Sequence, residues 1–236
     1  PTIAFIGGGN MASAIIGGLI HQGHPASQIE VVEPWAEARE ALRKNYGIEA
    51  QAEAGPALQR AQIVVWAVKP QTFRDAAAQA KAHTQGALHL SVAAGIRSDS
   101  IAQWLGTERI VRTMPNTPAL VGKGMSALYA RPAVSAPERQ SIEAIMATTG
   151  EFLWVDSEPQ LDAVTALSGS GPAYVFYFLE AMTRAGTGMG LTEQQAHQLA
   201  VGTFVGASEL ARRSDDPPSV LRQRVTSKGG TTYAAL

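Results

Sequence analysis

Six residues near the start of the chain, Gly7 to Ala12, read GGGNMA and form the pattern Gly-x-Gly-x-x-Ala. They follow the apolar run Ile3–Ile6 and precede an amphipathic helical pattern. Gly7 suits a tight strand-to-helix turn, Gly9 lets the backbone approach a diphosphate, and Ala12 permits close packing of the helix on the sheet. Free amides at the helix start add donors and the positive end of the helix dipole. The pattern therefore predicts a dinucleotide site; the alternative is a Gly-rich turn without a ligand.

A second candidate is Glu33, which ends the next apolar run, Ile29–Val32. A carboxylate there can accept hydrogen bonds from both hydroxyls of an adenine ribose and repel a 2′-phosphate, which favours NADH. Two alternatives stay open: Glu33 caps the strand before Pro34, or Arg39 or Arg43 reaches a 2′-phosphate. The prediction is therefore NADPH or NADH.

Two later segments combine glycines with hydroxyl residues: SGSGP at Ser168–Pro172 and TSKGGTT at Thr226–Thr232. In SGSGP, Ser168 and Ser170 precede a helix whose first turn suits proline, which predicts hydroxyl caps and free N–H groups there. Structural capping alone also explains that pattern. In TSKGGTT, two glycines free the backbone to present amides among hydroxyl groups, which suits a small carboxylate. The alternative is a loop that only joins two helices.

The elements that must position these residues follow from hydrophobic patterning. Apolar, β-branched runs alternate with Ala-rich segments of helix length, which indicates βαβ units. The runs are apolar on both faces, as in parallel strands covered by helices. We therefore predict an α/β fold with a Rossmann-type doubly wound sheet, whose edge is completed by two runs that flank a helix at 135–148. The predicted strands are Ile3–Ile6, Ile29–Val32, Ile63–Val68, Leu88–Val92, Ile110–Met114, Met125–Tyr129 and Phe152–Val155.

The pattern changes in the last third of the chain, where helical spacing appears at Ala173–Ala185 and Glu193–Arg212 without strand signals. We predict a dinucleotide-binding domain at residues 1–156 and an all-helical domain at 157–236. The helix from Ala173 carries aromatic residues on several faces, more apolar surface than a short helical domain can cover. At least a homodimer is therefore expected.

Composition excludes several function classes. Nineteen Lys and Arg face twenty Asp and Glu, a formal net charge of -1 that gives no reason to expect nucleic acid or membrane as a partner. The absence of cysteine removes disulfides and thiol nucleophiles and fits the cytoplasm. Five histidines form no ligand cluster, so no metal is expected. A start at Pro1 and an end at Leu236 in a helix-like stretch predict that residues are missing at both termini, so that the C-terminus is truncated.

Taken together, six motifs in order resemble the pyrroline-5-carboxylate reductase family. They are GGGNMA, AVKP at Ala67–Pro70, AAG at Ala93–Gly95, MPNTP at Met114–Pro118, SGSGPAY at Ser168–Tyr174, and TSKGGTT. The resemblance implies hydride transfer from NADPH or NADH to the cyclic imine 1-pyrroline-5-carboxylate, which gives L-proline in the last step of proline biosynthesis. It also implies helical domains that interlock in a homodimer or higher oligomer and complete each site across it.

The resemblance also implies residue roles. Taken alone, AVKP reads as a strand terminator and MPNTP as a rigid turn. Family members commonly carry Asn at the position of Ala54 and proline at that of Lys228. The implied cofactor-binding residues are Gly7, Gly8, Gly9, Asn10, Met11, Glu33, Ala67, Val68, Lys69, Pro70, Ala93, Ala94, Gly95, Asn116, Thr117 and Pro118. The implied substrate-binding residues are Ser170, Ser227, Gly230, Thr231 and Thr232.

For the reaction, Thr232 is the candidate catalytic residue, through a hydrogen bond on the imine-nitrogen side. A protonated imine is already electrophilic, so positioning supplies most of the rate enhancement. Two other functions compete. A 3-hydroxyacid dehydrogenase would need a lysine on the first long helix of the second domain, and no lysine occurs between Lys123 and Lys228. A non-catalytic nucleotide-sensing module would need the glycine loop but not TSKGGTT.

Overall fold

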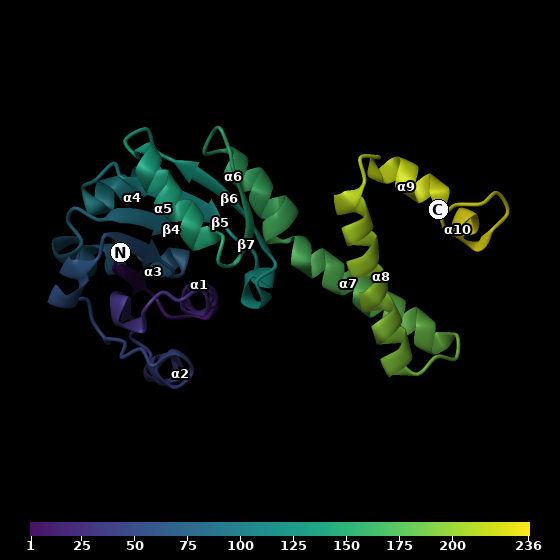
Figure 1. Cartoon of the computed structure of the whole chain (residues 1–236), viewed down its shortest axis with the longest axis horizontal. Helices are drawn as coiled ribbons and strands as arrows, with labels where there is room; N and C mark the ends of the chain where they lie inside the picture. The colour runs from purple at the N-terminus through teal and green to yellow at the C-terminus, as the bar shows by residue number, and fades with distance from the viewer. The chain divides into compact units, whose positions relative to one another are not determined.

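The computed structural model describes residues 1–236, which divide into two compact units, Pro1–Pro172 and Ala173–Leu236 (Figure 1). The first unit is α/β and the second is entirely helical. This confirms the predicted fold class. The predicted boundary at Asp156 stays a prediction. In the structure, residues 157–172 belong to the first compact unit.

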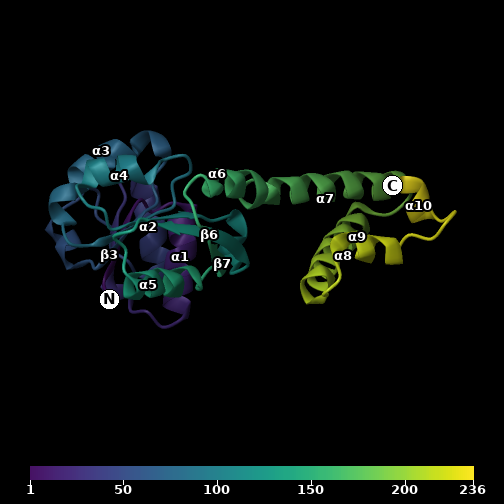
Figure 2. The same cartoon turned by 90° about the horizontal axis from the view of Figure 1, so that it is seen from above.

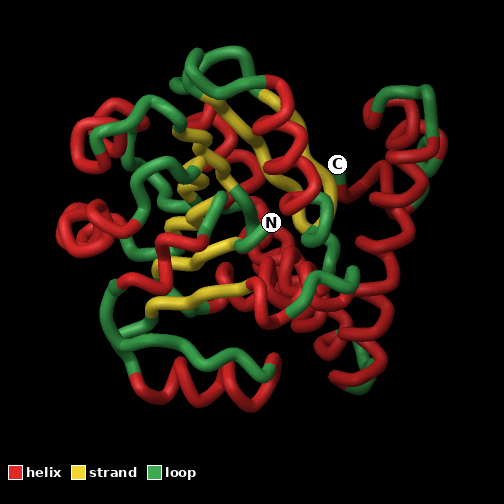
Figure 3. Tube along the Cα trace, turned by 60° about the vertical axis from the view of Figure 1, so that its left-hand side comes forward, coloured by secondary structure: helices red, strands yellow, loops and turns green.

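A single seven-stranded sheet forms the centre of the first unit, in the order β2-β1-β3-β4-β5-β6-β7 (Figure 3). The first five strands along this order run parallel, β6 is antiparallel to β5, and β7 is parallel to β6. All seven predicted strands are present. Their bounds are β1 Ile3–Ile6, β2 Ile29–Val32, β3 Ile63–Trp66, β4 Leu88–Ser91, β5 Ile110–Met114, β6 Gly124–Ala130 and β7 Gly150–Trp154.

Helices cover both faces of this sheet, as the doubly apolar strands require. One face packs on α1 (Asn10–His21), α2 (Ala36–Tyr46) and α5 (Ala136–Met146). The opposite face packs on α3 (Pro70–Ala80) and α4 (Ser98–Leu105), and Figure 2 shows these two helices across the sheet from α5. Short 3₁₀ turns lie at Ala26–Gln28, Pro56–Arg60, Lys81–His83 and Thr117–Val121.

The core beneath α3 and α4 contains a buried histidine. The Trp66 ring stacks on Phe73 with centroids 5.0 Å apart, and its Nε1 donates to Nδ1 of His89 at 3.0 Å. Burial, assisted by the positive charge of Arg109, lowers the pKa of His89 to about 4. His89 is therefore neutral at physiological pH and acts as an acceptor within the core.

A continuous helical segment leads out of the first unit. The short helix α6 (Gln160–Val164) passes into a π-helical turn, Thr165–Gly169, and Ser170 then precedes α7 (Gly171–Gly188). The Ser170 N–H donates to the Thr165 carbonyl at 2.8 Å, the i to i+5 bond of a π turn. Turns of this kind are frequent at functional sites.

In the second unit, α7 is followed by α8 (Glu193–Arg213), α9 (Pro218–Arg224) and α10 (Thr231–Ala235). A capping box at Thr192 starts α8. The helices α7 and α8 approach closely at Gly186. A Cβ added there would lie only 2.9 Å from the Cβ of Ala196. No helix has the length and apolar character needed to cross a membrane.

Candidate active site

The glycine loop joins β1 to α1 in a backbone shape that only glycine tolerates. Gly7 has φ +98°, and its N–H donates to the Val32 carbonyl at 2.8 Å. A Cβ on Gly7 would lie 2.3 Å from the carbonyl oxygen of Ala67. The first glycine is thus required for the close approach of the loop to the end of β3.

Gly9 differs, because a Cβ built on it meets no protein atom within 4 Å. It is the N-cap residue of α1, and no side chain caps that helix end. The amides of the first turn are therefore available to a ligand, and the helix dipole favours an anion there. Space that a methyl group would fill, beside uncapped amides, fits the diphosphate of a dinucleotide.

A cleft of about 830 Å³ opens beside this loop. It lies at the carboxyl ends of the strands, where ligands bind in open parallel sheets. Of the predicted cofactor residues, it brings together the glycine loop, Glu33 and the Ala67–Lys69 segment. Pro70, Ala93, Ala94, Gly95, Asn116, Thr117 and Pro118 are not among its lining residues. The sequence pattern did not indicate several of the residues that line it: Trp35, Ala38, Ala41, Ala52, Thr72, Asp75, Ala76, Gln79 and Val92.

Glu33, directly after β2, is hydrogen-bonded to the glycine loop. One carboxylate oxygen accepts the Gly8 N–H at 2.7 Å, and the other accepts the Trp35 N–H at 2.8 Å. Arg39 donates through Nη1 to the carbonyls of Glu33 and Pro34, at 3.0 and 2.7 Å. The carboxylate therefore lies at the cleft with a fixed orientation, while the Arg39 guanidinium is bound to backbone carbonyls.

Arg43, the other candidate for a 2′-phosphate, pairs with Glu40 at 2.5 Å on the exposed side of α2. That hydrogen bond and charge raise the pKa of Arg43. Arg43 is not among the residues that line the cleft.

Of the two serines expected to cap α7, Ser168 is already part of a helical turn. The Ser168 hydroxyl donates to the Val164 carbonyl at 3.2 Å, four residues earlier, rather than capping a new helix. Ser170 has right-handed helical torsions at the junction of the π turn and α7. The predicted helix with Pro172 in its first turn is present, since α7 begins at Gly171. The prediction of a Ser168 cap was wrong, because Ser168 lies within the π turn that continues from α6.

The TSKGGTT segment forms a tight turn that leads into α10. The Gly230 N–H donates to the Ser227 carbonyl at 2.9 Å, and Gly229 has φ +75°. Thr226 is engaged outside the turn, since its hydroxyl donates to the Arg222 carbonyl at 2.6 Å. Thr232, in the first turn of α10, is half-buried. These residues lie in the second unit, whereas Ser170 lies in the first.

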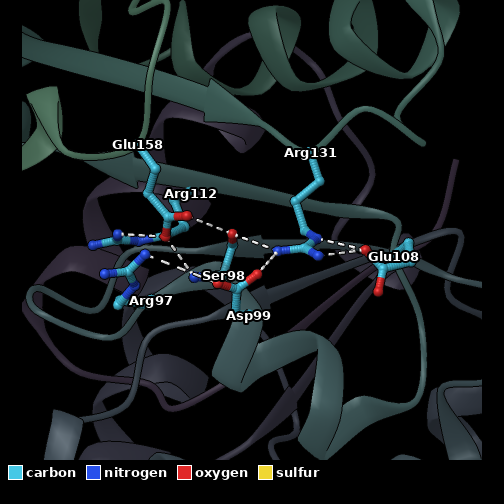
Figure 4. Close-up of polar contacts among 7 residues, drawn as sticks. All are labelled: Arg97, Ser98, Asp99, Glu108, Arg112, Arg131 and Glu158. Atoms are coloured by element: carbon cyan, nitrogen blue, oxygen red, sulfur yellow. Dashed lines mark hydrogen bonds and ion pairs between the residues drawn. The ribbon is translucent and has the colours of Figure 1, made fainter.

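Sequence reasoning missed a polar network around Glu158, two residues before α6 (Figure 4). The Glu158 carboxylate accepts from the Arg112 guanidinium at 2.8 Å, from the Ser98 N–H at 2.5 Å and from the Ser98 hydroxyl at 2.7 Å. Arg131 donates to the same hydroxyl at 2.9 Å. Burial raises the pKa of Glu158, but the Ser98 donors and Arg112 outweigh it and hold the pKa below its ordinary value. The available signal was a charged residue, Arg112, in the middle of the predicted strand β5.

No group of His, Asp or Glu side chains is arranged to hold a metal ion. The glycine loop and the cleft beside it can bind a dinucleotide.

Comparison with known proteins agrees with both parts of the fold. A family model described as "Pyrroline-5-carboxylate reductase dimerisation" matches residues 158–236, and one described as "NADP oxidoreductase coenzyme F420-dependent" matches residues 2–95. The pyrroline-5-carboxylate reductase of Pseudomonas aeruginosa is 46% identical over 100% of this chain and 87% of its own length. That of Haemophilus influenzae is 42% identical over 99% of this chain and 87% of its own.

Solved structures show the same likeness. A pyrroline-5-carboxylate reductase from Coxiella burnetii superposes with a TM-score of 0.90 at 37% identity, covering 99% of this chain and 88% of its own. The pyrroline carboxylate reductase of Plasmodium falciparum, solved with NADP bound, gives a TM-score of 0.89 at 28% identity, covering 99% of this chain and 87% of its own.

Proposed function

The chain belongs to the pyrroline-5-carboxylate reductase family, and we propose that it reduces the cyclic imine 1-pyrroline-5-carboxylate to L-proline, the last step of proline biosynthesis. It is an oxidoreductase that uses NADPH or NADH. The observation that carries the proposal is the 46% identity to the Pseudomonas aeruginosa reductase over the whole chain.

For the cofactor, the residues present fit a dinucleotide at the glycine loop. The uncapped amides of α1 and the open space at Gly9 would hold its diphosphate. When bound, NADPH or NADH supplies the hydride from its nicotinamide ring. Glu33 would face the adenine ribose and select against a 2′-phosphate. The other proposed cofactor residues are Gly7, Gly8, Asn10, Met11, Ala67, Val68, Lys69, Pro70, Ala93, Ala94, Gly95, Asn116, Thr117 and Pro118.

For the substrate, the TSKGGTT turn and Ser170 are the proposed binding residues. Backbone amides around Gly230 and the Ser227 and Thr231 hydroxyls would hold the carboxylate. The Thr232 hydroxyl would donate to the imine nitrogen side, or to a water there, and so orient the imine carbon toward the hydride donor. A protonated imine needs no strong acid from the protein, which suits a pocket of hydroxyls and amides.

The chain forms a homo-oligomer and acts on a small molecule. We propose at least a homodimer that is built on the second unit. Large apolar side chains of α7 and α8 remain exposed within one chain, and two grooves of about 590 and 500 Å³ lie along these helices. The exposed residues are Tyr174, Val175, Phe176, Tyr177, Phe178, Met182, Leu199, Val205 and Leu210. A domain boundary near residue 156 and a cytoplasmic location complete the proposal.

A single assay tests the function. Oxidation of NADPH and of NADH is followed with 1-pyrroline-5-carboxylate, and the product is identified as proline. The same protein is then assayed in reverse with 3-hydroxyacids. Turnover of hydroxyacids without imine reduction would indicate a dehydrogenase, and cofactor binding without turnover of either substrate would indicate a nucleotide-sensing module.

A further inference from the structure

Asn116 uses both ends of its side-chain amide within the protein. Its Nδ2 donates to the Ser168 carbonyl at 3.1 Å, and its Oδ1 accepts the Met125 N–H at 2.9 Å. One side chain therefore joins three segments: the MPNTP loop after β5, the start of β6, and the π turn that precedes Ser170.

Strand β5 also contacts residues 158–169, which comprise Glu158, α6 and the π turn, at two more points. Arg112 and Met114 lie on one face of the strand, because they are two residues apart. Arg112 forms a buried ion pair with Glu158 at 2.8 Å, with side-chain exposures of 7% and 11%. The Met114 methyl lies against Gly169, where an added Cβ would come within 2.7 Å of it. The segment is thus held at its base by an ion pair and at its end by Asn116.

These contacts connect the two loops to which the proposed function assigns different ligands. MPNTP is a proposed cofactor loop, and Ser170 is a proposed substrate residue. The Ser168 carbonyl belongs to the π turn directly before Ser170. The i to i+5 hydrogen bonds of a π turn interrupt the regular i to i+4 pattern of an α-helix. A misplacement of about 1 Å can cost about a hundredfold in rate, because reacting atoms must meet in a near-attack geometry.

We propose that Asn116 is a positioning residue, whose amide sets the place of the Ser168–Ser170 turn relative to the MPNTP loop and thereby aligns the imine with the hydride donor. The inference rests on the proposed function. It assigns the Asn116 side chain to the protein's own turn and leaves the backbone of Asn116 as its proposed contribution to the cofactor site.

The first test is N116D, which keeps the shape of the side chain and its acceptor for the Met125 N–H but loses the donor to Ser168. We expect kcat/KM for the imine to fall about ten- to a hundredfold. The dissociation constant of NADP⁺, measured by calorimetry, should stay within about twofold, because the altered bond joins the side chain to Ser168 and the backbone of Asn116 is unchanged.

Two further readouts separate positioning from loss of structure. With NADPH deuterated at the transferred position, the isotope effect on kcat/KM should be larger in N116D than in the parent protein, since hydride transfer becomes slower relative to binding. Lowering the pH should raise the ratio of variant to parent kcat/KM, because protonation of the introduced carboxyl restores a donor to the Ser168 carbonyl.

N45D is the matched control, because Asn45 is exposed on α2 and outside the cleft. It should match the parent protein in every readout. If N116D is unfolded at the assay temperature, N116A provides the same comparison of isotope effect and NADP⁺ affinity. The inference fails if the Asn116 variants keep full kcat/KM, or if their loss appears as weaker NADP⁺ binding with an unchanged isotope effect. A parent protein that does not reduce the imine refutes the proposed function instead, and this inference with it.

Discussion

The Glu33 carboxylate and the Gly8 N–H form a hydrogen bond of 2.7 Å that ties the acidic end of β2 to the glycine loop. The second carboxylate oxygen is held by the Trp35 N–H. Glu33 therefore keeps its place at the cleft without a ligand, and the negative charge is fixed where an adenine ribose is expected. Fixing a charge in this way lowers the cost of ordering it when a ligand binds.

We predict that Glu33→Ser raises the efficiency with NADPH relative to NADH. The change removes a negative charge that would face a 2′-phosphate. Steady-state kinetics with both cofactors gives the ratio of their kcat/KM values. Glu37→Ser, on the exposed start of α2, is the control for loss of one charge. An unchanged ratio in Glu33→Ser would assign Glu33 to loop structure alone.

The glycine loop offers a matched pair of alanine substitutions with opposite expectations. Gly7→Ala places a methyl group 2.3 Å from the Ala67 carbonyl at a φ of +98°, so the free energy of unfolding should fall by about 2 kcal/mol or more. Gly9→Ala meets no protein atom, so stability should change by about 1 kcal/mol at most.

For cofactor affinity, Gly9→Ala is the substitution with a direct effect. The methyl group of Gly9→Ala occupies space at the uncapped start of α1, so the dissociation constant of NADPH should rise about tenfold or more in a folded protein. Urea unfolding and calorimetry measure the two effects. Normal NADPH binding by Gly9→Ala would show that the diphosphate does not lie at this loop.

The buried His89 should make the protein sensitive to mild acid. Its pKa is lowered to about 4 in the folded state, from 6.5 for the unperturbed group. Between these pH values the unfolded chain binds the proton and the folded chain does not, so stability falls as the pH drops from about 6.5 toward 4. The loss should reach about 3 kcal/mol.

His89→Gln removes this titration and keeps an acceptor for the Trp66 N–H. Urea unfolding at fixed protein concentration should show a flatter pH dependence for the variant than for the parent protein. His21→Gln, at an exposed position at the end of α1, is the control for replacing a histidine outside the core. Equal slopes for His89→Gln and the parent protein would contradict this account.

The fold was predictable because the local signals agree with one another. β-branched runs that are apolar on both faces require covering helices, and each run became a strand. The glycine loop was predictable for the same reason, because an apolar strand precedes it and an amphipathic helix follows it in the sequence. The predicted run Ile63–Val68 is two residues too long, because β3 ends at Trp66 and the next two residues, Ala67 and Val68, line the cleft.

The parts that sequence reasoning missed depend on long-range contacts. Ser168 was expected to cap a helix, but its hydroxyl donates to the Val164 carbonyl, because the π turn continues from α6 and contains Ser168. The Arg112–Glu158 pair joins residues that are 46 positions apart, and nothing local in either stretch indicates the partner. The contacts of Asn116 and Glu158 are therefore visible only in the folded structure.

The last prediction concerns Thr232, the proposed hydrogen-bond donor on the imine-nitrogen side. Thr232→Val keeps the shape of the side chain and removes its hydroxyl. The lost bond should cost about 1.5 to 3 kcal/mol, or about ten- to a hundredfold in kcat/KM. The effect should fall mainly on kcat, because this bond matters most as charge moves in the transition state, and the affinity for NADH should barely change.

Thr226→Val is the comparison within the same segment. Its hydroxyl already donates to the Arg222 carbonyl at the end of α9, so it is not available to a substrate, and a smaller loss of kcat/KM is expected. Kinetics of both variants on the complete chain, with the oligomer intact, separate a role in the reaction from a general loosening of the turn. If Thr232→Val retains full kcat/KM, the amides around Gly230 could still hold the carboxylate, but the assignment of the Thr232 hydroxyl would be wrong.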